Sequence, residues 1–139
     1  MESLMIEGKH GAFFTPSVSL NTNSGECEIS GQSYLENTTS FYQQIIDWMK
    51  EYVRSVQGPI KLKLFLTYFN TSSSKCLAEL LWILKDYQSE GGDVQVNWHY
   101  EDWDEDMRKE GEDFVDETGL KMTFIEEETP EDEEEEEFF

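Results

Sequence analysis

The sequence predicts a single-domain α/β fold with one mixed sheet, in which an N-terminal antiparallel hairpin precedes alternating strands and helices. Three observations predict it. The hydrophobic period switches between two residues and about 3.6 residues along the chain, turn-forming residues separate the periodic segments, and 139 residues suffice for one ordinary domain. We expect the domain to span residues 1–126 and a disordered acidic tail to span residues 127–139.

The N-terminal segment predicts extended structure. Residues 4–7 can form a strand, and residues 17–21 and 26–30 flank the turn Thr22-Asn23-Ser24-Gly25, which is a pattern typical of a hairpin. We expect these strands to form the antiparallel edge of the sheet.

An amphipathic helix and a central strand follow the hairpin. Residues 39–56 carry apolar side chains at steps of three and four after the capping candidates Asn37 and Thr38, and Gly58-Pro59 ends this helix. Residues 60–69 alternate at first and then become apolar on both faces, which predicts a strand that enters the middle of the sheet.

The remaining segments repeat this order. A second helix over residues 76–87 stops at Gly91-Gly92, residues 94–100 alternate as a strand, residues 104–117 can form a third helix, and residues 121–125 a last strand. Because strands that alternate with helices form right-handed crossovers, we expect a mostly parallel sheet of four to five strands.

Charge is unevenly distributed along the chain. Residues 1–100 hold 11 acids and 7 bases, whereas residues 101–139 hold 20 acids and 3 bases, and the total is −21. Such a field repels nucleic acid and anionic membranes, and no segment is apolar enough to insert into a bilayer. We therefore expect a cytoplasmic protein whose partners are other proteins.

The sequence lacks the usual signatures of catalysis. It contains no phosphate-binding loop and no metal-ligand spacing, so we expect no cofactor, no metal site and no catalytic residue, and hence no enzyme. Cys27 and Cys76 are expected to be small buried thiols. A hydrolase that used Ser72 or Cys76 with His99 would require these side chains to approach within hydrogen-bonding distance.

Four consecutive hydroxyl residues begin at Thr71, between the strand of residues 60–69 and the second helix. In open α/β sheets this kind of junction forms the functional edge. The free N–H groups at a helix N-terminus stabilise an anion, so a phosphate on Thr71, Ser72 or Ser73 would be tolerated here. The same residues, with Asn70, also fit simple helix capping, and both interpretations stay open.

Aromatic rings and carboxylates alternate where the next strand leaves the sheet, in Trp98-His99-Tyr100-Glu101 and at Trp103. Because this strand should end at the same carboxyl edge as the hydroxyl cluster, the two segments can form one protein-binding rim. The expected partner-binding residues are Asn70, Thr71, Ser72, Ser73, Trp98, His99, Tyr100 and Trp103.

Three separated motifs resemble the SiaC family of bacterial regulatory phosphoproteins. They are Asn70-Thr71-Ser72-Ser73-Ser74-Lys75, Trp98-His99-Tyr100-Glu101 and Gly111-Glu112-Asp113-Phe114, in that order. The resemblance spans about residues 4–126 and includes Gly31, Tyr34, Glu36 and Asn37. The family itself is similar to anti-sigma-factor antagonists, which are switched by phosphorylation at a strand-to-helix junction.

The resemblance implies a partner-switching cycle. A dedicated serine/threonine kinase would phosphorylate the protein at Thr71 and a PPM-type phosphatase would reverse this. The unphosphorylated form would bind and activate a diguanylate cyclase, which links it to c-di-GMP signalling and biofilm formation. The acidic tail is a departure from the family pattern, so the alternative is a passive acidic adaptor that acts through this tail. Neither the output pathway nor the oligomeric state follows from the sequence.

Overall fold

The computed structural model of this chain describes residues 1–129, and the predicted tail beyond Thr129 lies outside the described residues. The strands are β1 (Leu4–Ile6), β2 (Lys9–His10), β3 (Phe14–Thr15), β4 (Ser17–Leu20), β5 (Glu26–Ser33), β6 (Ile60–Phe69), β7 (Val94–Glu101) and β8 (Thr123–Glu127). The helices are α1 (Thr38–Glu51), the π-helical turn η1 (Tyr52–Val56), α2 (Thr71–Ser89) and α3 (Glu105–Thr118). The predicted mixed α/β class is confirmed.

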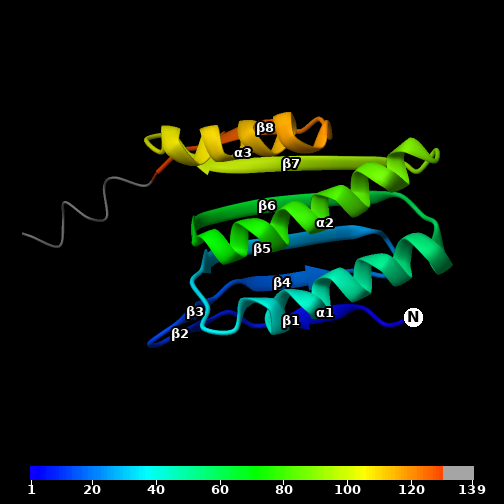
Figure 1. The fold of residues 1–139 in the computed structure, drawn as a ribbon, viewed down its shortest axis with the longest axis horizontal. Coiled ribbons are helices and arrows are strands. Elements are labelled where there is room, and N and C mark those ends of the chain that lie inside the picture. Colours follow the sequence, from blue (N-terminus) through cyan, green and yellow to red (C-terminus); the bar gives the residue numbers. More distant parts are fainter. Residues whose placement is uncertain (130–139) are drawn as a thin grey trace, which may run out of the picture.

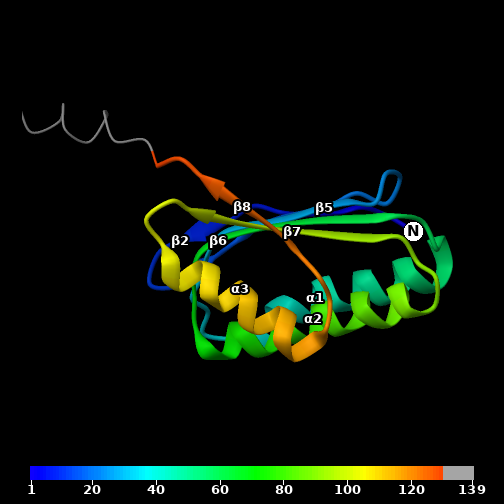
Figure 2. The same cartoon turned by 90° about the horizontal axis from the view of Figure 1, so that it is seen from above.

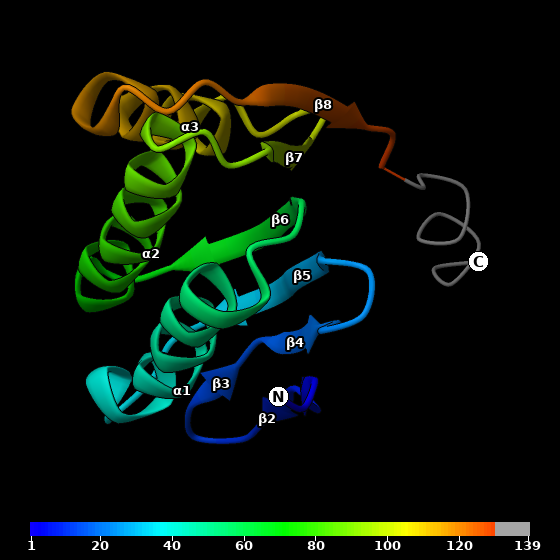
Figure 3. The ribbon, with the colours of Figure 1, turned by 90° about the vertical axis from the view of Figure 1, so that its right-hand side faces the viewer.

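One six-stranded sheet organises the molecule, in the order β1-β4-β5-β6-β7-β8. The β1, β4 and β5 strands pair antiparallel, whereas β5, β6, β7 and β8 pair parallel (Figure 1, Figure 3). The carboxyl ends of the four parallel strands therefore lie at one edge of the sheet, which we call the carboxyl edge. The helices α1, α2 and α3 all begin at this edge (Figure 1).

The helices cover only one face of the sheet, as the view from above shows (Figure 2). The alternation in β6 explains this arrangement, because Ile60, Leu62 and Leu64 are buried under the helices whereas Lys61 is exposed and Lys63 half-buried on the other face. We call this other side the open face. A sheet with one solvated face carries polar side chains there, and the alternation in the first half of β6 places Lys61 and Lys63 on it.

The structure corrects three details of the predicted elements. The sheet has six strands where four to five were expected, and a separate two-stranded hairpin of β2 and β3 was not predicted. The predicted helix of residues 39–56 ends as an α-helix at Glu51 and continues as a π-helical turn up to Gln57, whose φ of 55° is left-handed. The predicted helix of residues 76–87 begins earlier, at Thr71.

The core lies between the sheet and the helix layer. Cys27 is buried there as predicted, and burial raises the pKa of its thiol to about 12. The prediction of burial is wrong for Cys76, which is only half-buried, and both thiols are free. No helix in residues 1–129 is both long and apolar enough to span a bilayer.

Candidate functional site

The junction between β6 and α2 lies at the carboxyl edge and is organised by Asn70. The Asn70 side chain is the N-cap of α2 and its Oδ1 atom accepts from the backbone N–H of Ser73 at 3.0 Å. The same oxygen accepts from Ser73 Oγ at 2.7 Å and from Ser72 Oγ at 3.2 Å. One amide oxygen therefore accepts from a backbone N–H of the first turn and from two side-chain hydroxyls of the helix.

Thr71 occupies the first helical position and is exposed. Its hydroxyl makes no hydrogen bond to any residue in the described part of the chain. Because Asn70 already supplies the cap, the Thr71 hydroxyl is not required for it, so the capping interpretation does not account for this residue. A phosphate at this position would lie beside the free N–H groups of the first turn.

The next two hydroxyls connect α2 to other elements. Ser72 Oγ lies 2.8 Å from Thr38 Oγ1, at the start of α1. Ser73 Oγ lies 2.8 Å from Ser33 Oγ at the end of β5, and Ser33 Oγ lies 2.7 Å from the Tyr42 hydroxyl in α1. The β6–α2 junction is thus joined by hydroxyl groups to the neighbouring strand and the neighbouring helix.

This buried network has a consistent direction of donation. Each hydroxyl carries one proton, so Tyr42 can donate to Ser33, Ser33 to Ser73, and Ser73 to Asn70 Oδ1, which can only accept. Burial raises the pKa of Tyr42 from 10.0 to about 12, so its hydroxyl stays protonated, and able to donate, well above neutral pH. All the hydroxyls of the network are then satisfied, as buried polar groups must be.

Burial separates the three predicted phosphate acceptors. Ser73 has 0% of its surface exposed and its hydroxyl belongs to the network, so the structure removes it from the accessible positions. Ser72 is exposed but bonded to Thr38 and Asn70. Thr71 is the one of the three that combines exposure with an unengaged hydroxyl in the described residues.

The aromatic residues of β7 and of the turn that follows it also differ in their exposure. Trp98 is 1% exposed and donates from Nε1 to the Met107 carbonyl at 3.0 Å, and Tyr100 is also buried. Both were predicted to contact a partner, but in this structure their side chains are buried and face the helix layer. Trp103, at the turn that leads to α3, is 64% exposed and remains available at the carboxyl edge.

His99 points to the open face, as its alternation with Trp98 predicts. Its Nδ1 atom lies 2.6 Å from Glu127 Oε2 in β8, and its ring lies 5.9 Å from that of Phe65. Ser72 and Cys76 belong to α2, which covers the opposite face of the sheet (Figure 2). The sheet therefore separates His99 from both nucleophiles of the hydrolase alternative, and this structure does not support that alternative.

Two of the sequence motifs meet in a packing contact. The Trp98 ring lies 5.6 Å from that of Phe114, and a Cβ atom added to Gly111 would lie 2.7 Å from Trp98 Nε1. Gly111 and Phe114 thus let α3 pack closely on β7. Through these contacts the two motifs shape the fold beside the carboxyl edge.

Sequence reasoning missed three residues of the site, namely Ser33, Thr38 and Tyr42. Each is buried and contributes a hydroxyl to the junction from β5 or α1. Ser33 is a polar residue at the end of a strand, and Tyr42 falls on the apolar face of its helix. Their common signal is a hydroxyl at a buried position, which requires a partner, but the sequence does not identify that partner.

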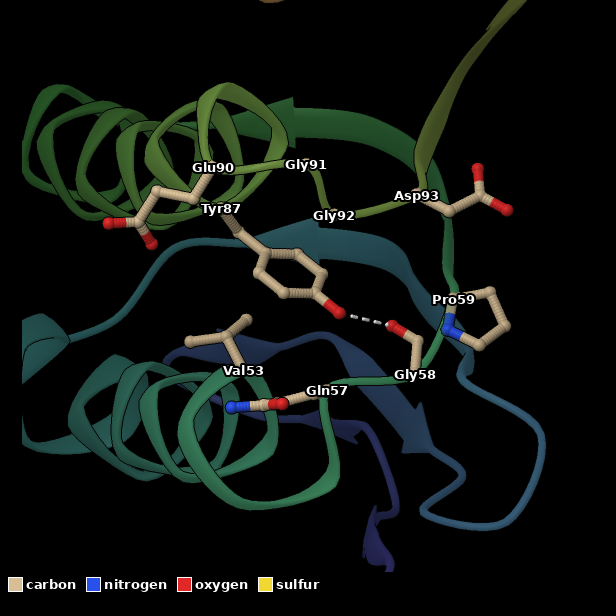
Figure 4. A pocket seen from close by; sticks show the side chains of 9 residues that line it. All are labelled: Val53, Gln57, Gly58, Pro59, Tyr87, Glu90, Gly91, Gly92 and Asp93. Carbon is tan, nitrogen blue, oxygen red and sulfur yellow. Dashed lines mark hydrogen bonds between the residues drawn. The ribbon is translucent and has the colours of Figure 1, made fainter.

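A hollow at the opposite edge of the sheet is distinct from the junction (Figure 4). Tyr87 closes it by donating from its hydroxyl to the Gly58 carbonyl at 2.7 Å. Sixteen residues of α2 separate Tyr87 from Thr71, a rise of about 24 Å. The side chains that line it include two carboxylates and neither a histidine nor a cysteine, and residues 1–129 contain no cluster of three potential metal ligands. Its lining residues are Val53, Gln57, Gly58, Pro59, Tyr87, Glu90, Gly91, Gly92 and Asp93.

Comparisons with known proteins agree on one family. The family described as SiaC family regulatory phosphoprotein matches residues 6–127. An uncharacterized protein of Pseudomonas aeruginosa strain UCBPP-PA14 is 32% identical over 114 residues, which cover 82% of this chain and 88% of the relative.

Solved structures from Pseudomonas aeruginosa are similar over most of their length. The crystal structure of apo-SiaC has a TM-score of 0.82 and 29% identity, covering 90% of this chain and 99% of that one. A chain in the crystal structure of the diguanylate cyclase SiaD in complex with its activator SiaC has a TM-score of 0.83 and 29% identity. It covers 89% of this chain and 99% of its own.

Proposed function

Because this chain belongs to the SiaC family of regulatory phosphoproteins, we propose that it activates a diguanylate cyclase by binding it, and that phosphorylation of Thr71 blocks this binding. The protein would then act as the switchable component of a c-di-GMP signalling system, without catalysis of its own. SiaC of Pseudomonas aeruginosa is named as the activator of the cyclase SiaD, and its fold is similar to this one.

The observation that carries the proposal is the state of the Thr71 hydroxyl. It is exposed, lies at the carboxyl edge and is not needed for the helix cap, since Asn70 supplies that cap. A kinase can therefore modify Thr71 without breaking a hydrogen bond within residues 1–129. Modification of Ser73 would instead require the buried network to open.

The effect of the phosphate follows from its charge. At neutral pH it adds about −1.5 to −2 charges and three strong acceptors to a surface that was neutral at Thr71. The N–H groups of the first turn of α2 would stabilise these charges in the free protein. A partner that packs over the junction would have to desolvate them, which weakens the complex.

We assign the contact surface to exposed groups of the carboxyl edge. Thr71 and Ser72 would form its centre, Asn70 would hold them in place, and Trp103 would add an aromatic contact. His99 remains a candidate contact on the open face. Trp98, Tyr100 and Ser73 would support this surface from the core and not touch the partner.

The proposed cycle needs two further proteins, a serine/threonine kinase and a PPM-type phosphatase. Incubation of the purified chain with such a kinase, followed by fragment mass spectrometry, should give one phosphate on Thr71. Thr71→Ala should abolish it, whereas Ser72→Ala should leave it in place. Phosphate on Ser72 in the wild-type chain would move the switch by one residue and contradict our assignment.

The cyclase step is tested by measuring c-di-GMP synthesis. Each diguanylate cyclase of the source cell is assayed alone, with the wild-type chain, with Thr71→Ala and with Thr71→Glu. We expect one cyclase to be stimulated by the wild type and by Thr71→Ala, but not by Thr71→Glu. Equal stimulation by Thr71→Glu would refute the phosphate block.

A passive adaptor that acts through its acidic tail is the alternative function. No observation on residues 1–129 favours it, since the tail lies outside the described residues. A chain that ends at Thr129 separates the two hypotheses, because the switch hypothesis predicts unchanged cyclase stimulation and the adaptor hypothesis predicts its loss.

A further inference from the structure

The exposed side of α2 carries a continuous stripe that begins at Thr71. Trp82 is 42% exposed, although it lies in the middle of a helix whose other large apolar residues are mostly buried. Eleven residues separate Thr71 from Trp82, which corresponds to three turns, a rise of about 16 Å and an angular offset of roughly 20°. The candidate phosphate acceptor and this tryptophan therefore lie on one face of the helix.

Hollows lie on both sides of this stripe, because α2 runs between α1 and α3 (Figure 1). The hollow toward α3 is lined by Ser74, Lys75, Ala78, Glu79, Trp82 and Glu117. The hollow toward α1 is lined by Thr39, Gln43, Ile46, Ser72, Lys75, Cys76 and Glu79. Lys75 and Glu79 line both, so the stripe is a ridge between two grooves. We call Thr71, Lys75, Ala78, Glu79 and Trp82 the α2 ridge.

Charge changes sign along the α2 ridge. Lys75 lies one turn from Thr71 and is exposed, and it forms no ion pair with any residue in the described part of the chain. Glu79 lies one turn further, and Glu117 of α3 faces the same groove beside Trp82. The end near Thr71 is therefore basic because of Lys75. The end near Trp82 is acidic because of Glu79 and Glu117, and Ala78 and the Trp82 ring supply its apolar surface.

We propose that the α2 ridge is the docking surface for the cyclase, an inference that rests on the function proposed above. The occupant is an amphipathic segment of the partner that places an apolar side chain on Trp82 and Ala78. Charge complementarity sets its polar groups, with an acidic residue opposite Lys75 and a basic residue opposite Glu79 and Glu117. Exposed tryptophans are frequent anchors of such contacts.

The same arrangement explains how a phosphate on Thr71 releases the partner. Thr71 and Lys75 are four residues apart on one helix, a spacing at which opposite charges attract. The phosphate pairs with Lys75 and repels the partner's acidic residue, so it removes the basic end of the ridge. Binding at Trp82 alone is then too weak to hold the complex.

The test compares two exposed aromatic residues on opposite faces of the molecule. Trp82→Ala removes the anchor on the helix side, whereas Tyr68→Ala removes a ring that is 47% exposed at the end of β6. Thermal unfolding first shows that both variants are folded. Titration against the stimulated cyclase should then give a Kd raised about tenfold or more for Trp82→Ala and less than about threefold for Tyr68→Ala.

Lys75 provides a second measurement that does not depend on Trp82. Lys75→Gln should weaken cyclase binding, and Thr71→Glu should cost less in the Lys75→Gln background than in the wild type, because the two changes remove the same contact. If the fold-loss in affinity of the double variant equals the product of the losses of the two single variants, Lys75 does not mediate the switch. That result would overturn this part of the proposal.

The possible outcomes separate the α2 ridge from the function on which it rests. Stimulation by the wild type with unchanged binding of Trp82→Ala overturns the ridge and leaves the activator function intact. Loss of binding by Tyr68→Ala and not by Trp82→Ala also overturns it and moves the docking surface to the other face. A wild-type chain that stimulates no cyclase overturns the activator function itself, together with its docking surface.

Discussion

Asn70 and Thr71 are neighbours with separate roles. The Asn70 amide oxygen accepts from three donors on α2, whereas the Thr71 hydroxyl contacts none in the described residues. The sequence predicted the cluster and its place at a strand-to-helix junction. It left capping and modification as competing interpretations of the same residues, because both require short polar side chains at a helix start. The structure assigns the cap to Asn70, and modification of Thr71 stays a prediction.

The first prediction concerns stability at this junction. Asn70→Ala should lower the free energy of unfolding by about 1–3 kcal/mol, since it removes the cap and leaves buried donors of the network unsatisfied. Thr71→Ala should change it by less than about 0.5 kcal/mol, as expected of an exposed side chain. Urea unfolding measures both. A loss at Thr71 as large as that at Asn70 would show that the Thr71 hydroxyl is structural.

The second prediction concerns alkaline pH. Burial raises the pKa of Cys27 from its ordinary value of 9.0 to about 12, so the folded protein holds this proton more tightly than the unfolded chain. This contribution to stability is fully present below pH 9 and is lost as pH rises from 9 to 12. Between pH 9 and 10 the unfolding free energy should fall by up to about 1.4 kcal/mol per unit from this thiol.

Cys27→Ala tests the assignment. The substitution lowers stability at pH 7 because it removes packed atoms from a buried position, but it should make the slope between pH 9 and 10 shallower. Tyr42, whose pKa burial raises from 10.0 to about 12, adds a further loss only above pH 10. An identical slope in wild type and variant between pH 9 and 10 would contradict the role of Cys27.

At the scale of elements, the β6 strand was predicted closely, whereas the two-residue strands β2 and β3 were not predicted. The strand of residues 60–69 was predicted with the bounds that β6 has, because Gly58-Pro59 precedes it and a long run of alternating and then continuously apolar residues carries a strong signal. The hairpin of β2 and β3 has two residues in each strand and is held by pairing of Phe14 with Tyr34. Two residues show no periodicity, so only the tertiary contact defines this element.

Helix ends show the same limit. The period of apolar residues continues through the π-helical turn of residues 52–56, so the sequence predicted one uninterrupted helix. The apolar period of α2 was detected only from Cys76, because its first turn consists of polar residues, of which Ser72 and Ser73 make hydroxyl contacts with Thr38 and Ser33. Contacts between elements, which a single periodic segment does not encode, determine both boundaries.

The third prediction concerns the packing of α3 on β7. Gly111→Ala should destabilise the protein by about 1–3 kcal/mol, since the added Cβ would lie 2.7 Å from Trp98 Nε1 and force the helix outward. Gly11→Ala is the matched control, because no atom lies within 4 Å of its added Cβ. Thermal unfolding of the two variants should show a clear loss for Gly111 and little change for Gly11. Equal stabilities would mean that α3 is not held close to Trp98.

At the scale of the whole molecule, the sheet separates a helix-covered side from an open face, and the two sides carry different candidate functional residues. Three helices cover one face of the sheet, and the carboxyl edge gathers the starts of all three (Figure 2). The proposed switch residue Thr71 and the α2 ridge lie on the helix side, whereas His99 and the pair with Glu127 lie on the open face. A phosphate on Thr71 would therefore act on partners of the helix side and leave the open face unchanged.

The fourth prediction concerns the net charge of the whole chain. Seven of the acids lie in residues 130–139, so a chain that ends at Thr129 has a net charge of −14 where the full chain has −21. Because like charges repel within a compact molecule, the full chain should gain more thermal stability from added salt than the shortened one. Melting temperatures in about 10 mM and 500 mM NaCl measure this, since the Debye length falls from about 30 Å to a few Å over that range. Equal changes of melting temperature with salt in the two chains would show that the charges of residues 130–139 do not act on the stability of the folded domain.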